Sequence, residues 1–344
     1  MEITKNQSKI LQTMATLMML FLHLFNREHI GLFTPLIYVG SQPLSYYLSL
    51  FCDCCVPIFC FVSGYGLYHT YNKNETPYTK NNLRRILKLY INYWLILFIF
   101  AICLGFLLNK HGYPGDWMTL FLNILAVDNL YNGAWWFFFT YILLVFSSSI
   151  IFRIAKSNYA ILLFLFSIGF YLISFYFRIY SPNLFDSVFI NWIQRQICLY
   201  GCSFFPFLIG ALSLKYKWNT KVSLFFNKVK LKNSLALTAI IVLIIIHGLI
   251  PNFIVAPFLA IPFILLFNQI KFSNQINKLI LKLSVHSTNL WLIHMFFYQV
   301  YFKNFIYSAK YVLLIFLLLI GCSFLSSYFI NKIYHPILKL KFIK

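Results

Sequence analysis

Long apolar runs recur along the whole chain, separated by short polar segments that are rich in lysine and arginine. Runs of 17–20 apolar residues match the length that a helix needs to cross the hydrocarbon core of a bilayer. The strict alternation of apolar and polar residues that marks the strands of a membrane barrel is lacking. The pattern therefore predicts an all-α, polytopic membrane bundle. Its ten predicted spans lie near residues 8–25, 45–69, 89–108, 133–152, 159–177, 197–214, 234–250, 252–269, 285–302 and 311–330.

The segments between these runs are short. The apolar run 117–127 is too short to span, which predicts an interfacial or re-entrant segment. No polar segment is long enough to form a separate soluble domain, so we expect one membrane domain over residues 1–344.

Composition supports the membrane assignment. Apolar residues make up 61% of the chain and charged residues 10%, whereas soluble domains carry roughly 45–50% and about 25%. This balance argues against an ordinary soluble enzyme and against a disordered protein. Four of the eight cysteines, Cys52, Cys54, Cys55 and Cys60, fall in one apolar run. Their spacing is not typical of a metal site, so we interpret them as small packing residues and expect no metal.

The basic residues predict the orientation of the chain. The sequence has 28 lysines and arginines against 7 acidic residues, a net charge of +21. With the N-terminus in the cytoplasm, 22 of the 28 basic residues fall in cytoplasmic segments and 6 in outer segments. This bias predicts that both termini are cytoplasmic. The same bias explains most of the net positive charge, because basic residues gather on the cytoplasmic side of a membrane protein. We therefore expect a lipid bilayer as partner and no nucleic acid.

Ionisable side chains within spans are costly and point to function. His23 lies near the outer end of the first span, and Gln12 lies 11 residues earlier on the same predicted helix face. Lys9 lies close to that face as well. One hypothesis is a polar track that ends in a histidine acting as general base. The alternative is an interfacial histidine that is hydrogen-bonded to a loop.

Two further ionisable groups lie within predicted spans. Asp53 is the one acidic residue inside a span, and it could orient His23, as a carboxylate does in a catalytic dyad. It could instead pair with an outer arginine such as Arg27 or Arg195. His294 falls near the middle of the ninth span, where it could serve the site or bond a neighbouring helix. The histidines at span edges, for which we expect solvated positions, are His69, His247 and His286.

Residues on the cytoplasmic side offer a site for an anion. Arg84 and Arg85 follow one another just before the third span. They could anchor the span to the membrane surface, or they could bind a nucleotide phosphate, since guanidinium groups match phosphate geometry. In the second span, Ser63 and Gly64 are small enough to permit close approach of another helix.

Five stretches in order resemble acyltransferase family 3, the multi-spanning bacterial membrane acyltransferases. Gln12–His23 is similar to the family's opening helix, and Val56–Tyr65 is similar to its VPxFFxxSGY pattern, followed by the arginine pair. Leu290–His294 is similar to a late YLIH pattern. Asn132–Phe137 and Phe205–Gly210 resemble two further family segments. The resemblance covers about residues 8–335.

The resemblance implies a membrane O-acyltransferase of the cell envelope, located in the inner (cytoplasmic) membrane. Its donor would be acetyl-coenzyme A or another acyl-coenzyme A, used as co-substrate without a bound cofactor. Its acceptor would be a sugar hydroxyl of a surface polysaccharide or its lipid-linked precursor. His23 would be the general base and Asp53 its orienting partner. The residues expected to bind substrate or coenzyme A are Arg84, Arg85, Ser63, Gly64, His294, Lys9, Gln12 and Trp136.

One position departs from the family pattern. The family usually carries arginine or lysine 11 residues before the first-helix histidine, where this chain has Gln12, with Lys9 one turn earlier. A function of another class fits the same helices: a transporter or flippase for a polysaccharide or glycolipid, without acyl chemistry. The histidine discriminates between the two, because transfer to a hydroxyl needs a base near the thioester.

Overall fold

The computed structural model describes residues 2–26, 31–73 and 78–340, and these form helices together with one short hairpin. They group into two compact units. The first unit consists of Met1–Met19, Tyr47–Tyr78 and Thr140–Ser284, and the second of Leu20–Tyr46, Thr79–Phe139 and Val285–Lys344. Three helices have at least three residues in each unit: α1 (Lys5–Phe25), α2 (Leu44–Phe51) and α7 (Trp136–Lys156). Helix α4 has its first residue, Tyr78, in the first unit and the rest in the second.

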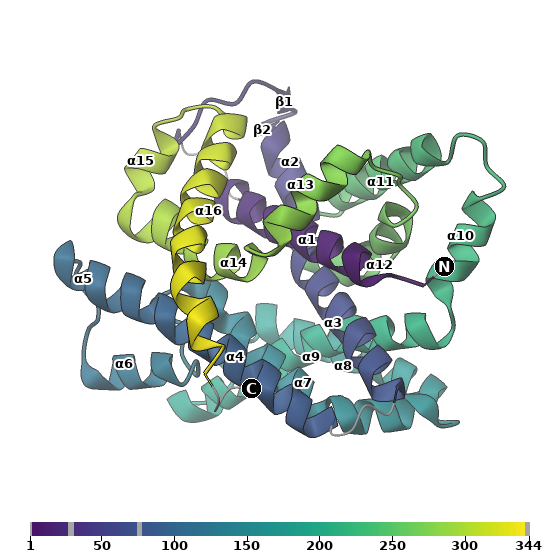
Figure 1. The fold of residues 1–344 in the computed structure, drawn as a ribbon, viewed down its shortest axis with the longest axis horizontal. Helices are drawn as coiled ribbons and strands as arrows, with labels where there is room; N and C mark the ends of the chain where they lie inside the picture. The colour runs from purple at the N-terminus through teal and green to yellow at the C-terminus, as the bar shows by residue number, and fades with distance from the viewer. Residues whose placement is uncertain (1, 27–30, 74–77, 341–344) are drawn as a thin grey trace. The chain divides into compact units, whose positions relative to one another are not determined.

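The first unit is built around two long helices that pack closely together, α3 and α9. Helix α8 packs against α9, α12 packs against α3, and α11 packs against α12. These helices are labelled in Figure 1. In chain order the elements of the first unit are η1 (Cys52–Cys54), α3 (Cys55–Asn72), α8 (Ala160–Ile179), α9 (Val188–Lys215), α10 (Trp218–Phe226), α11 (Lys232–Leu249), η4 (Phe253–Val255), α12 (Ala256–Phe267) and α13 (Asn274–Ser284).

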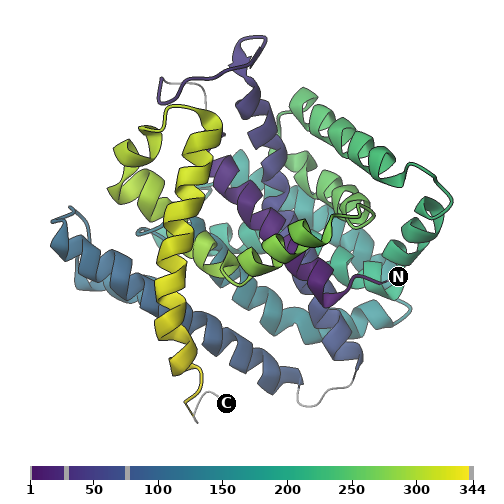
Figure 2. The same cartoon turned by 45° about the horizontal axis from the view of Figure 1, so that its top comes forward.

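The second unit contains the hairpin and two helices that are interrupted by π-helical turns. Helix α16 lies alongside α14 in both views (Figures 1 and 2). In chain order its elements are β1 (Tyr38–Val39), β2 (Gln42–Pro43), α4 (Tyr78–Ile96), the π-turn η2 (Leu97–Cys103), α5 (Leu104–Leu107), α6 (Trp117–Ile124), η3 (Gly133–Trp135), α14 (Ser287–Met295), the π-turn η5 (Phe296–Tyr301), α15 (Lys303–Tyr307) and α16 (Val312–Ile337).

Eight helices of the described residues are long and apolar enough to cross a membrane. They are Lys5–Phe25, Leu44–Asn72, Tyr78–Leu107, Gly133–Lys156, Ala160–Ile179, Val188–Lys215, Lys232–Leu249 and Val312–Ile337.

These helices differ from the predicted spans at several ends. Two of them begin well before the predicted spans 89–108 and 197–214, at Tyr78 and Val188. The physical reason is that hydropathy detects only the lipid-facing part of a helix, whereas polar residues continue the hydrogen-bonded helix beyond it. The predicted spans 252–269 and 285–302 correspond to shorter elements, Phe253–Phe267 and α14 continued by η5.

Two glycines allow α3 and α9 to pack backbone against backbone. A Cβ at Gly64 would overlap the carbonyl oxygen of Phe207, and a Cβ at Gly210 would overlap that of Phe61. Both glycines come from stretches that resemble the family pattern. Small residues at a helix interface let two backbones approach closely in a membrane, where packing rather than burial from water drives association. The two stretches therefore meet at a close backbone contact of the first unit's central helix pair.

Candidate functional site

Two histidines from distant parts of the chain form a hydrogen-bonded pair in the second unit. The Nδ1 atom of His23, in the last turn of α1, lies 2.7 Å from the Nε2 atom of His294, in the last turn of α14. Their ring planes differ by 8°, with centroids 5.0 Å apart. His294 is completely buried, whereas His23 is half-buried. One member of the pair is thus sealed in the protein, and the other is partly accessible.

Backbone carbonyls assign the protons of this pair. The Nδ1 atom of His294 lies 3.1 Å from the carbonyl oxygen of Leu290 and 2.8 Å from that of Trp291. A carbonyl oxygen can only accept, so Nδ1 of His294 carries the proton, and in the neutral ring Nε2 holds a lone pair. His23 therefore donates its Nδ1–H to His294. In neutral His23 the basic lone pair is then on Nε2, the atom suited to take a proton from a substrate.

A tyrosine that the sequence analysis did not single out lies beside the pair. The ring of Tyr298 is nearly parallel to both imidazoles, with centroids 6.3 Å from His23 and 6.0 Å from His294. Tyr298 is buried. The signal that could have found it is spacing, because Tyr298 follows His294 by four residues, which places both on one helix face.

Polar side chains from three helices hold the other end of α14. Asn289 accepts a hydrogen bond from Asn92 of α4 at 2.6 Å, and donates to Ser327 and Asn331 of α16 at 2.9 and 3.0 Å. All four are buried. His286, one turn earlier, lies 2.8 Å from the Ser327 hydroxyl. Buried polar groups that satisfy one another specify a single arrangement of helices. The network therefore fixes the rotation of α14, and with it the direction of His294.

The arginine pair lies in the first part of α4. Arg85 is exposed and Arg84 is half-buried, and consecutive helix positions point about 100° apart. The Tyr334 hydroxyl donates to the carbonyl of Lys88 at 2.9 Å, which ties the C-terminal part of α16 to this segment. Two basic helix ends thus meet in the second unit. Such a surface suits an anion, so the phosphate hypothesis for Arg84 and Arg85 remains chemically sound, and it stays a prediction.

The remaining predicted residues of the first helix lie outside the second unit. Lys9 and Gln12 belong to the part of α1 in the first unit, where Lys9 is exposed and Gln12 is half-buried. The same helix continues without a break to His23, as the predicted polar track requires. The binding roles of Lys9 and Gln12 stay predictions.

Asp53 lies in the first unit, within the 3-10 turn η1 that interrupts the second span. The positive charge of Arg178, at the end of α8, acts on its carboxyl group. Arg178 also lies 5.1 Å from the centre of the Phe253 ring. Arg178 was not among the arginines named from the sequence. Of those two, Arg27 lies outside the described residues, and a pairing of Asp53 with Arg195 stays a prediction. His23 belongs to the second unit, and the dyad with Asp53 remains a prediction.

Ser63 and Gly64 lie in the middle of α3, where Ser63 is half-buried and Gly64 is buried. The contact between Gly64 and the α9 backbone accounts for the glycine at this position. A role in leaving room for a substrate is untested.

Of the two neighbouring tryptophans, Trp136 was the one expected at the site. It is half-buried, and its ring packs against Phe137. Trp135 is buried and donates its Nε1–H to the carbonyl of Leu292 at 2.9 Å, two residues from His294. Trp135, which the sequence analysis did not name, therefore bonds the histidine helix. A binding role for Trp136 stays a prediction.

One expectation for the span-edge histidines is wrong. His247 is completely buried, and both of its ring nitrogens lack a hydrogen-bond partner among the described residues. The reason is that the last turn of α11 packs against Phe51, whose ring meets the imidazole edge to face at 6.4 Å. His69 is exposed, as expected, and His286 is half-buried. The four cysteines Cys52, Cys54, Cys55 and Cys60 are free thiols in buried positions.

Comparison with known proteins identifies one family. The family model for the acyltransferase domain called acyltransferase 3 matches residues 7–332. The match includes both histidines of the pair and the arginine pair. No curated protein and no solved structure matches the chain significantly.

Proposed function

The chain belongs to the acyltransferase 3 family, and from this premise we propose that it moves an acetyl group from acetyl-coenzyme A to a sugar hydroxyl. The acceptor would be a cell-surface polysaccharide or its lipid-linked precursor. A membrane acyltransferase of this kind acts in the inner membrane, where it meets the donor on the cytoplasmic side. The hydrogen bond between His23 and His294 is the observation that carries the proposal.

In the proposed reaction, Nε2 of His23 takes the proton of the acceptor hydroxyl. The oxygen attacks the thioester carbonyl carbon, the carbon–sulfur bond breaks, and the departing thiolate takes up the proton that His23 received. The products are an O-acetyl ester and coenzyme A, and His23 is neutral again. A hydroxyl is a weak nucleophile at neutral pH, and a base that receives its proton makes the attack possible. General bases of this kind accelerate such steps by about 10²–10⁴-fold.

His294 would act as a positioning residue in this scheme. When His23 takes up the proton it becomes an imidazolium, and its Nδ1–H still donates to the lone pair of His294. The hydrogen bond to an acceptor is stronger when the donor is charged. His294 therefore stabilises the protonated state of the base and holds its ring in one orientation, a role that a carboxylate plays in other enzymes.

Arg84 and Arg85 would hold the phosphates of coenzyme A at the cytoplasmic end of α4. The proposal rests on their charge and on the second basic segment that Tyr334 brings alongside. In the family, the residue at the position of Gln12 is usually a cation that would hold the acceptor or the donor. Glutamine at this position would therefore affect which substrate is bound.

The test is transfer of radiolabelled acetyl from acetyl-coenzyme A to membrane glycolipid or polysaccharide of the host. The purified protein is compared with His23→Ala and with His111→Ala, a control that removes an exposed loop histidine. We expect His23→Ala to lower transfer by about 100-fold or more, and His111→Ala to leave it unchanged. Transfer that persists in His23→Ala would show that His23 is not the general base. Failure of the wild-type protein with several acyl donors, in the presence of the acceptor, would favour the transporter.

A further inference from the structure

The segment between α5 and α7 turns back and runs along the span that precedes it. Gly105 near the end of that span lies against Tyr113. The carbonyls at the end of α6 accept hydrogen bonds from α4: Tyr93 bonds Asn123 at 2.6 Å, Trp94 bonds Ile124 at 2.8 Å and Tyr90 bonds Leu125 at 2.9 Å. The chain therefore returns from the level of residue 105 to that of residue 90, about 22 Å at 1.5 Å per residue. Of the two sequence alternatives for this run, this path along α4 fits the re-entrant one.

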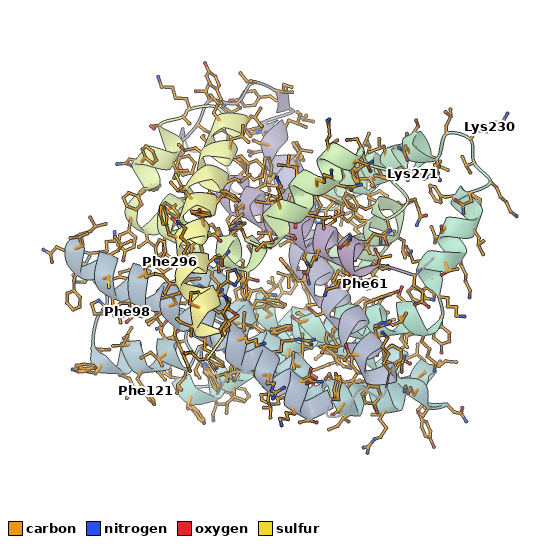
Figure 3. The ribbon with its side chains drawn as sticks, in the orientation of Figure 1. Phe61, Phe98, Phe121, Lys230, Lys271 and Phe296 are labelled. Carbon is orange, nitrogen blue, oxygen red and sulfur yellow. The ribbon has the colours of Figure 1, made fainter. Side chains whose placement is uncertain are left out.

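A non-helical stretch at this depth has to find partners for its backbone inside the protein, because hydrocarbon offers none. The three aromatic donors of α4 provide them for the end of α6. Tyr131 and Tyr113 provide more: the Tyr131 hydroxyl bonds the carbonyl of Pro114, and the Tyr113 hydroxyl bonds that of Tyr131 at 2.7 Å. The outward side of the segment carries Phe121, which is exposed, as is Phe98 of η2, whereas Phe296 is buried (Figure 3).

The segment ends in a tight turn that is hydrogen-bonded to α14 on both sides of His294. Asn132 and Trp135 both donate to the carbonyl of Leu292 at 2.9 Å. In return Trp291 donates to the carbonyl of Ala134 at 3.0 Å. The N–H of Ala134 also contacts the sulfur of Met295 at 3.0 Å. Four bonds thus join a turn of four residues to the single helical turn that carries His294.

The bonded turn lies next to a change of helix type. Helix α14 ends at Met295, the main-chain N–H of Phe296 is directed at the carbonyls of Ile293 and His294, and the π-turn η5 begins at Phe296. Short π-helical turns occur frequently at functional sites. The side chains of Asn132 and Trp135 bond the carbonyl of Leu292, four residues before η5 begins, and they therefore hold the junction between α14 and η5 in place.

From these contacts we infer that Asn132 and Trp135 are positioning residues for the reaction, and that the re-entrant segment exists to fix His294. The inference rests on the proposed function. His294 keeps its proton on Nδ1 only while the carbonyls of Leu290 and Trp291 stay within hydrogen-bond distance, and these carbonyls lie at the start of the bonded turn. If the turn moves, the lone pair that accepts from His23 moves with it. A displacement of about 1 Å in a reacting group can lower the reaction rate by about 10²-fold.

The principal variant is Trp135→Phe, which keeps an aromatic ring and removes the Nε1–H donor. Its matched control is Trp117→Phe, the same change at an exposed position of α6. We expect Trp135→Phe to lower kcat about 10- to 100-fold with KM for acetyl-coenzyme A nearly unchanged, and the control to keep both. Asn132→Ser is the second variant, because serine can still cap the turn through its hydroxyl while the amide donor is lost.

Side-chain nitrogen NMR of histidine-labelled protein, assigned with His294→Gln, reads the arrangement without any substrate. We expect a protonated Nδ1 and an unprotonated Nε2 for His294 in the wild type and the control, and a mixture of both forms in Trp135→Phe. An unchanged His294 signal and unchanged kcat in both variants would overturn the inference. If the wild-type protein transfers no acyl group while the NMR shift appears, the proposed function fails and the positioning contact stands.

Discussion

At the scale of single residues, backbone carbonyls decide the chemistry of the candidate base. Leu290 and Trp291 hold the proton of His294 on Nδ1, which makes its Nε2 an acceptor for His23. Which nitrogen of His23 carries the basic lone pair is therefore decided by the tautomer of His294. A histidine in this position is held in one tautomer by the hydrogen bond at its other nitrogen.

Tyr298 offers a test of what its ring contributes to the pair. The contacts with both imidazoles are ring to ring, so the expected result is that Tyr298→Phe keeps most of the transfer rate. Tyr298→Leu removes the flat surface and should lower kcat about tenfold, within the 0.5–1.5 kcal/mol that aromatic contacts contribute. Rates of both variants, measured at saturating acetyl-coenzyme A, check this. Equal loss in both would mean that the hydroxyl, and not the ring, is the important group.

At the scale of elements, close backbone packing and interhelical hydrogen bonds both hold helices together. Gly64 and Gly210 let α3 and α9 touch through their backbones. In the second unit, side-chain amides and hydroxyls join α14 to α4 and α16. Close packing and interhelical hydrogen bonds are the two forces that remain when apolar burial cannot drive helices together.

A glycine pair on one helix tests the packing contact. Gly64→Ala forces a methyl group against the carbonyl of Phe207, whereas Gly66→Ala, two residues later, meets open space. We expect Gly64→Ala to destabilise the protein by roughly 1–3 kcal/mol, and Gly66→Ala to leave stability unchanged or slightly higher. Thermal unfolding in detergent compares the two. Similar unfolding temperatures for both variants would show that α3 and α9 can move apart to accommodate the methyl group without loss of stability.

At the scale of the whole molecule, charge predicts which way the chain faces. The bias of 22 basic residues to 6 predicts that both termini are cytoplasmic. In that orientation His23 would lie in the outer half of its span, and Arg84 and Arg85 would lie on the inner side. A donor held by these arginines would present its acyl group from the cytoplasm to a base near the outer face.

Cysteine labelling tests this orientation. In a Cys103→Ser background, which removes the exposed native thiol, His111→Cys places a thiol in the loop before α6 and Lys228→Cys places one after α10. A membrane-impermeant maleimide added to intact cells should label position 111, and position 228 only after permeabilisation. Both substituted residues are exposed, so access is decided by the side of the membrane. The reverse pattern would mean that the chain is inverted.

Much of this architecture is readable from the sequence because the signals are local. Apolar length identified the helices, and the family-like stretches marked His23, His294 and the arginine pair individually. The ends of the α4 and α9 helices were missed because helices continue past the apolar part. The burial of His247 was missed because it depends on how α11 meets Phe51.

The sequence by itself determined an all-helical membrane chain and its family, because hydropathy and motif spacing are properties of short segments. Only the tertiary structure joined His23 to His294 across 271 positions. It also brought Asn132 and Trp135 to the carbonyl of Leu292 in the histidine helix, and turned the run 117–127 back along α4. These outcomes depend on helix rotation and on which side chains reach a given carbonyl, and such properties arise only when separate segments pack against one another.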